Sequence, residues 1–98
     1  MYIRIAFGER GDIAVWSEKE MRNLPFESVA RRWRQEIFFE APEEIAGEET
    51  LTVERGTVAY WRQGRALCLF HGLSQPYGPV VKLGAVVGNP DLLSSVED

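Results

Sequence analysis

Two short apolar runs, residues 57–61 and 66–70, constrain this chain more than any other feature. They are separated by the four residues 62–65, which include Gly64. Runs of this length that are rich in β-branched and aromatic residues and joined by a short glycine-containing connection are typical of a β-hairpin. In both runs, the residues that point to one face and those that point to the other are mostly apolar, so both faces of the hairpin should be covered. We expect the core on one face and a helix, loop or ligand on the other.

Further strands are predicted on both sides of this hairpin. Residues 2–7 alternate with the period of two that indicates a half-buried strand. A glycine-flanked connection, 8–11, leads to a second apolar run at 12–16, and together these predict an N-terminal hairpin. Residues 33–40 and 80–87 are predicted as later strands.

Two short helices complete the predicted elements. Ser17 stands three residues before Glu20, which is capping-box spacing, and this predicts a helix over 17–24. Residues 91–96 predict a brief terminal helix, and the acidic segment 43–49 a solvated loop. About six or seven short strands favour a mainly β fold, a small closed or nearly closed β-barrel, because closure removes exposed sheet edges.

Composition predicts one folded domain over residues 1–98 and excludes several function classes. The 11 basic residues are interleaved with 15 acidic ones for a net charge of −4, so we expect no nucleic-acid partner. No apolar run approaches the ~20 residues of a membrane span, and residues 1–5 do not resemble a signal peptide, which predicts a cytoplasmic protein. Cys68, the only cysteine, is interpreted as a buried apolar residue, and with His71 as the only histidine we expect no metal or other cofactor.

Three stretches carry a resemblance to a known family. They are Trp33-x-x-Glu36-Ile37-Phe38-Phe39-Glu40, the segment 56–72 with its paired aromatic residues and glycines, and Leu83-Gly84-x-Val86-x-Gly88. The chain therefore resembles small prokaryotic cyclophilin-like proteins, a family of unknown function. The resemblance implies a cyclophilin-like β-barrel and says less about activity.

The chain departs from the family pattern in the pocket loops and at the end. Arg34-Gln35, Thr57 and Arg62-Gln63 replace the usual residues, and the loop after the central hairpin differs at 73–76. The family's last strand has no counterpart before Asp98. We therefore expect an incompletely closed barrel, or one completed by a second subunit.

These features favour a binding module over an enzyme, and no catalytic residue is assigned. We predict that a small polar molecule or a short, proline-containing peptide binds between the Glu36 strand, the central hairpin and the loop 72–79. Glu36 shares a strand face with Phe38, and its carboxylate either binds ligand or pairs with a neighbouring arginine. The candidate ligand-binding residues are Glu36, Phe38, Tyr60, Trp61, Phe70, His71 and Ser74.

Two alternative functions remain. A peptidyl-prolyl isomerase needs an apolar slot and a donor, typically an arginine, for which Arg32, Arg62 and Arg65 are candidates. The isomerases' Phe-His-Arg stretch is matched here only as far as Phe70-His71, because Gly72 follows. The other alternative is a structural protein that forms homo-oligomers through an open barrel edge.

Overall fold

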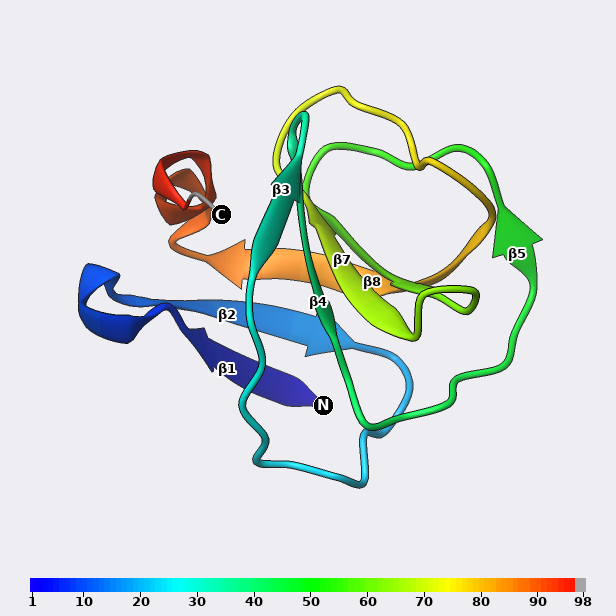
Figure 1. The fold of residues 1–98 in the computed structure, drawn as a ribbon, viewed down its shortest axis with the longest axis horizontal. Helices are drawn as coiled ribbons and strands as arrows, with labels where there is room; N and C mark the ends of the chain where they lie inside the picture. Colours follow the sequence, from blue (N-terminus) through cyan, green and yellow to red (C-terminus); the bar gives the residue numbers. More distant parts are fainter. Residues whose placement is uncertain (97–98) are drawn as a thin grey trace.

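The computed structural model describes residues 1–96 and consists mainly of antiparallel strands that form one curled sheet (Figure 1). The strands are β1 (Tyr2–Ala6), β2 (Asp12–Ser17), β3 (Arg31–Trp33), β4 (Glu36–Glu40), β5 (Glu49–Thr50), β6 (Thr57–Trp61), β7 (Ala66–Phe70) and β8 (Val80–Gly88). The 3-10 helices are η1 (Gly8–Arg10) and η2 (Pro90–Ser95). None of the helices in residues 1–96 has the length and hydropathy needed to cross a lipid bilayer.

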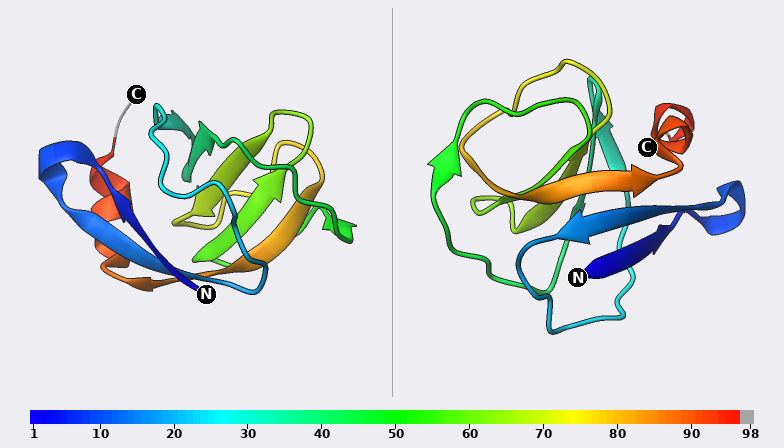
Figure 2. Two further views of the ribbon diagram at one scale, coloured as in Figure 1. Left: turned by 90° about the horizontal axis from the view of Figure 1, so that it is seen from below. Right: turned by 180° about the vertical axis from the view of Figure 1, so that it is seen from behind.

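The strands follow one another in the order β1-β2-β8-β6-β7-β4-β3, and the short β5 pairs with β8. Curling brings the two ends of this sheet, β1 and β3, toward each other, which gives a half-barrel and confirms the predicted mainly β fold class. Helix η2 lies between the β1–β2 hairpin and β3 (Figure 2). It is attached to both sides, because Arg10 donates to the carbonyl of Ser95 and Arg32 donates to the carbonyl of Leu93.

Two separate apolar cores lie on opposite faces of β4, β6 and β7. The larger core joins residues from both ends of the sheet, which can meet only inside the curl; its members include Ile13, Val15, Ile37, Phe39, Tyr60, Leu69, Leu83 and Leu93. The smaller core lies on the outer face and consists of Val53, Ala59, Cys68, Phe70 and Val80, flanked by Phe38 and Trp61. The alternation of side chains along each strand produces this division, so both faces of the central hairpin are covered, as predicted.

Two local predictions are wrong. Residues 17–24 form no helix: Ser17 pairs with Gly84 as the last residue of β2, and its hydroxyl donates to the carbonyl of Lys19 over 2.7 Å. The predicted strand 33–40 is divided into β3 and β4, because Arg34 takes a left-handed conformation (φ 56°) and turns the chain back on itself. The terminal helix exists, as the 3-10 helix η2.

Candidate functional site

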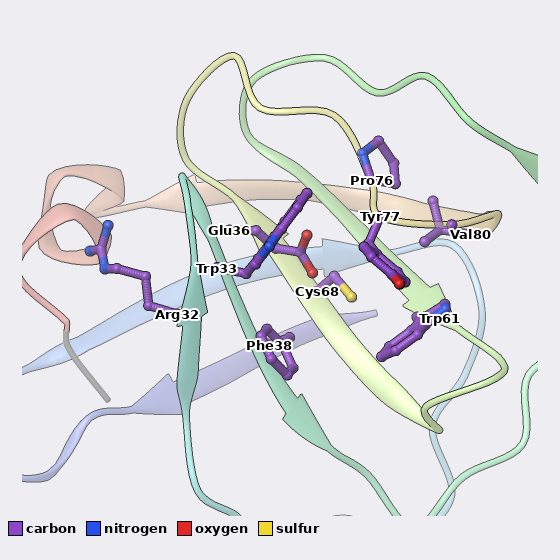
Figure 3. A pocket seen from close by; sticks show the side chains of 10 residues that line it. Arg32, Trp33, Glu36, Phe38, Trp61, Cys68, Pro76, Tyr77 and Val80 are labelled. Carbon is purple, nitrogen blue, oxygen red and sulfur yellow. The ribbon is translucent and has the colours of Figure 1, made fainter.

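A pocket of about 270 Å³ opens on the outer face of the sheet, above the smaller core. It lies between β4, the β6–β7 hairpin and the loop 72–79. Its lining is mainly apolar and aromatic, and Figure 3 shows the side chains grouped around Glu36 and Cys68. The lining residues are Arg32, Trp33, Glu36, Phe38, Trp61, Cys68, Pro76, Tyr77, Gly78 and Val80.

Glu36 places a carboxyl group in this apolar surrounding. It is the first residue of β4 and only 6% exposed. Burial raises the pKa of its carboxyl group above the ordinary value of 4.5, and a hydrogen bond with the Cys68 thiol opposes that shift. Burial also raises the pKa of Cys68, and the charge of Glu36 adds to the effect, so the thiol remains neutral.

The indole ring of Trp61 forms one wall of the pocket. Gly64, in the turn between β6 and β7, makes room for it, because a Cβ atom there would overlap the ring. On another side, the backbone of Gly78 lies close to Nε1 of Trp61. A Cβ atom added at Gly78 would lie 3.6 Å from Nε1, which is an ordinary van der Waals contact. Nε1 itself is buried and has no hydrogen-bond partner among residues 1–96. An unpaired buried donor costs free energy, and because this atom is closed to solvent, an acceptor could reach it only if the ring shifted.

Tyr77 connects the two tryptophans that border the pocket. Its ring meets Trp33 edge to face, with centroids 5.8 Å apart, and meets Trp61 at 6.2 Å. Tyr77 is nevertheless 77% exposed, so it stands at the mouth of the pocket. Aromatic pairs in this geometry contribute about 0.5–1.5 kcal/mol beyond their buried area.

Side-chain hydrogen bonds hold the loop 72–79 in place from two directions. The amide of Gln75 pairs with the backbone of Val53, accepting from its N–H (2.9 Å) and donating to its carbonyl (3.2 Å). On the other side, the side-chain oxygen of Gln35 accepts from the backbone N–H of Leu73. The backbone N–H of Gln35 donates to the hydroxyl of Ser74. The pocket is therefore largely formed before any ligand binds, which reduces the entropy lost on binding.

Arg32 lines the pocket with its stem while its charged end points toward η2 (Figure 3). The guanidinium donates to the carbonyl oxygens of Leu93 (2.9 Å) and Val96 (2.8 Å). It also lies 3.3 Å from Nε2 of His71. Burial and the nearby arginine charges lower the pKa of His71, so a neutral ring can accept this bond.

The structure brings together three of the seven candidate ligand-binding residues, Glu36, Phe38 and Trp61, in the pocket lining. Phe70 lies beneath the pocket in the smaller core. Three candidates lie elsewhere: Tyr60 faces the larger core and donates to the carbonyl of Glu43, His71 contacts Arg32, and Ser74 holds the loop.

Sequence reasoning did not select Trp33 and Tyr77 as ligand-binding residues. Trp33 precedes a turn that no local pattern predicts, and Tyr77 belongs to a loop whose position depends on distant hydrogen bonds. A tyrosine between two prolines in an otherwise polar loop was the available signal. Among residues 1–96, no group of three or more histidine, cysteine or acidic side chains is arranged to hold a metal ion.

The curled half-barrel and its outer pocket define a small, mainly β half-barrel protein. The model of the cyclophilin-like family matches residues 1–98, and the chain belongs to that family, which confirms the resemblance. A similar solved structure is the solution structure of a hypothetical protein from Archaeoglobus fulgidus. The two chains are 31% identical with a TM-score of 0.71, and the match covers 89% of this chain and 79% of the other. No curated protein matches the chain.

Proposed function

We propose that this protein is a non-catalytic binding module whose pocket takes a small molecule or a single side chain of a short peptide. The observation that carries the proposal is a buried carboxyl group, that of Glu36, at the base of a pocket with aromatic walls. Binding sites in proteins are typically apolar cavities with a few placed polar groups. The carboxyl group of Glu36 supplies such a polar group.

The geometry gives less support to prolyl isomerisation. That reaction needs a donor aimed at the peptide bond, whereas the buried charged group of this pocket is an acceptor. The arginine that lines the pocket, Arg32, has its guanidinium engaged with η2. We expect a proline tetrapeptide to exchange between cis and trans at the uncatalysed rate in the presence of micromolar protein, and acceleration would contradict a non-catalytic role.

A thermal-shift screen with a library of small polar molecules tests the proposal. A ligand at ten times its dissociation constant stabilises a protein by about 1.4 kcal/mol, which raises the melting temperature of a domain of this size by roughly 6 °C or more. Chemical-shift changes of the Trp61 indole N–H should then place each hit in the pocket. A screen without a stabilising compound, or hits that leave this signal unchanged, would contradict the proposal.

Tyr77→Ala is the variant best suited to this test. Although Tyr77 is 77% exposed, its removal loses the ring contacts with Trp33 and Trp61, so the melting temperature should fall by several degrees while the pocket wall opens and each hit weakens at least several-fold. Tyr2→Ala is the matched control, because Tyr2 is 73% exposed and lies on β1, away from the pocket. Equal losses of affinity in the two variants would place the ligand elsewhere.

A further inference from the structure

The charge that the lining residues turn toward the inside of the pocket is negative when Glu36 is ionised. Glu36 is the only carboxylate among the ten lining residues, and Cys68 is a neutral thiol. The one lining cation, Arg32, directs its guanidinium to the carbonyl oxygens of η2. A ligand that complements this pocket should therefore bring a positive charge to Glu36, which would also compensate the cost of keeping a buried carboxylate ionised.

The walls of the pocket favour a cation as well. Trp33, Phe38, Trp61 and Tyr77 surround the carboxyl group, and the face of an aromatic ring is electronegative. The guanidinium of Arg34 lies 4.8 Å from the centre of the Trp33 ring and occupies one of its faces, so a ligand would use the other face of that ring. Two independent features, a carboxylate and a set of rings, thus select the same sign of charge.

The size of the pocket and its few acceptors define the cation further. A volume of about 270 Å³ lies just below the ~300–1,000 Å³ of typical ligand sites, so it suits one small head group with a short stem. A primary ammonium has three N–H donors, and a pocket with a single carboxyl group would leave some of them unpaired. A fully methylated ammonium has no donors to satisfy and is attracted by ring faces.

We infer that the ligand of this pocket is a methylated ammonium cation, with its head group among Trp33, Trp61 and Tyr77 and with Glu36 as its counter-ion. This inference rests on the proposed binding function and names the chemical class of its ligand. Such a head group occurs both in free quaternary amines and on trimethylated lysine side chains.

Calorimetric titration with three probes of similar shape tests the charge. The probes are choline, the uncharged alcohol in which a carbon atom replaces its nitrogen, and ethanolamine, which has the same stem and a primary ammonium. We expect choline to bind at least about tenfold more tightly than either of the others, in line with a desolvated cation–π contact. Equal binding of choline and its uncharged analogue would overturn the inference.

Glu36→Gln tests the counter-ion, because it keeps the shape of the side chain and removes its charge. We expect choline to bind at least about tenfold more weakly to this variant, while the uncharged alcohol binds as before. Glu9→Gln is the matched control: Glu9 lies in η1, is exposed, and its loss changes the net charge by the same amount. If both variants weaken choline equally, the effect is one of overall charge and the assigned counter-ion is wrong.

A short peptide with one trimethyllysine distinguishes the two sources. Tighter binding of the peptide than of choline assigns the pocket to a modified side chain, and tighter binding of choline assigns it to a free amine; either result supports the methylated ammonium. The thermal-shift screen distinguishes failure of the cation inference from failure of the proposed binding function. A neutral or anionic hit in the pocket together with inert choline overturns the cation and leaves the binding module, whereas no hit of any charge overturns both.

Discussion

Glu36 is a buried carboxyl group whose protonation should be visible in the stability of the whole protein. Its pKa in the folded state is raised above 4.5, so the native protein holds this proton to a higher pH than the unfolded chain does. The free energy of unfolding should therefore fall as the pH rises from about 4.5 through the native pKa of Glu36. Each tenfold preference for the proton corresponds to about 1.4 kcal/mol.

Urea unfolding of Glu36→Gln and the natural protein across pH 4–8 measures this effect. Glutamine does not titrate, so the stability of the variant relative to the natural protein should grow as the pH rises through that window and then level off. The control Glu9→Gln removes an exposed carboxyl group and should change the free energy of unfolding by less than about 0.5 kcal/mol. A relative stability that shrinks with rising pH would mean that the native environment favours the carboxylate.

Gly64 and Gly78 approach the same indole ring but should differ in their tolerance of a methyl group. A Cβ at Gly64 would overlap the Trp61 ring, so Gly64→Ala should displace it, with a loss of about 1–3 kcal/mol in the free energy of unfolding and an altered tryptophan emission. A Cβ at Gly78 meets Nε1 at an ordinary 3.6 Å, so Gly78→Ala should cost less than about 0.5 kcal/mol. A loss at Gly64 as small as the loss at Gly78 would show that the Trp61 ring is free to move.

At the scale of single residues, alternation along a strand predicts which residues share a face and little more. It placed Glu36 with Phe38 and separated Tyr60 from Trp61, because neighbours in a strand point to opposite sides. It could not show which of the two aromatic residues faces the pocket, since that depends on which face the larger core covers. Nor could it find the left-handed conformation of Arg34, which no glycine marks.

Among the elements, η2 is tied to β3 through the side chain of Arg32. The planar guanidinium of Arg32 donates to Leu93 (2.9 Å), Ser94 (3.1 Å) and Val96 (2.8 Å), which satisfies carbonyl groups at the end of the helix. Lysine keeps the charge but cannot reach several acceptors with a rigid fork. Arg32→Lys should therefore lower the free energy of unfolding by about 2 kcal/mol and speed hydrogen exchange in η2.

Arg31→Lys is the control for this prediction, because Arg31 is the preceding residue of β3 and is exposed. It should change neither the stability nor the exchange of η2 by a measurable amount. If both variants leave the exchange of η2 unchanged, the apolar contacts of Leu93 hold the helix and the hydrogen bonds of Arg32 contribute little.

The elements that the sequence predicts well are those whose contacts are local. In the hairpins β1–β2 and β6–β7, the strands and their connection are continuous in the chain, so one pattern contains the whole element. The helix expected over 17–24 failed because its capping residue, Ser17, extends β2 beside β8, more than 60 residues further along the chain. Tertiary pairing thus overrode a local capping signal.

On the scale of the whole molecule, the predicted gap in the barrel is filled by a helix. Within residues 1–96 the sheet ends at β1 and β3, and η2 contributes Leu93 and neighbouring contacts to the larger core between them. Sequence patterns could suggest an open barrel but could not place η2, because its partners Arg10 and Arg32 lie far from it in the chain.

The two cores should unfold in a single step. Strands β4, β6 and β7 contribute alternate residues to both, so neither core can lose its strands while the other remains. In a Trp16→Phe background, fluorescence comes from Trp33 and Trp61 on the pocket side, whereas far-ultraviolet circular dichroism reports the whole sheet. The two signals should give the same urea midpoint.

A substitution on the opposite face completes this test. Ile37 is fully buried in the larger core, so its side chain lies on the face of β4 opposite the pocket. Ile37→Val in the same background should nevertheless lower the free energy of unfolding by about 0.5–1.5 kcal/mol by both signals. Leu73→Val, at a residue that is 81% exposed, should move neither midpoint. A fluorescence midpoint that stays in place while the dichroism midpoint falls would show that the pocket face is stable without the barrel interior, and the pocket would then be an independent unit of the fold.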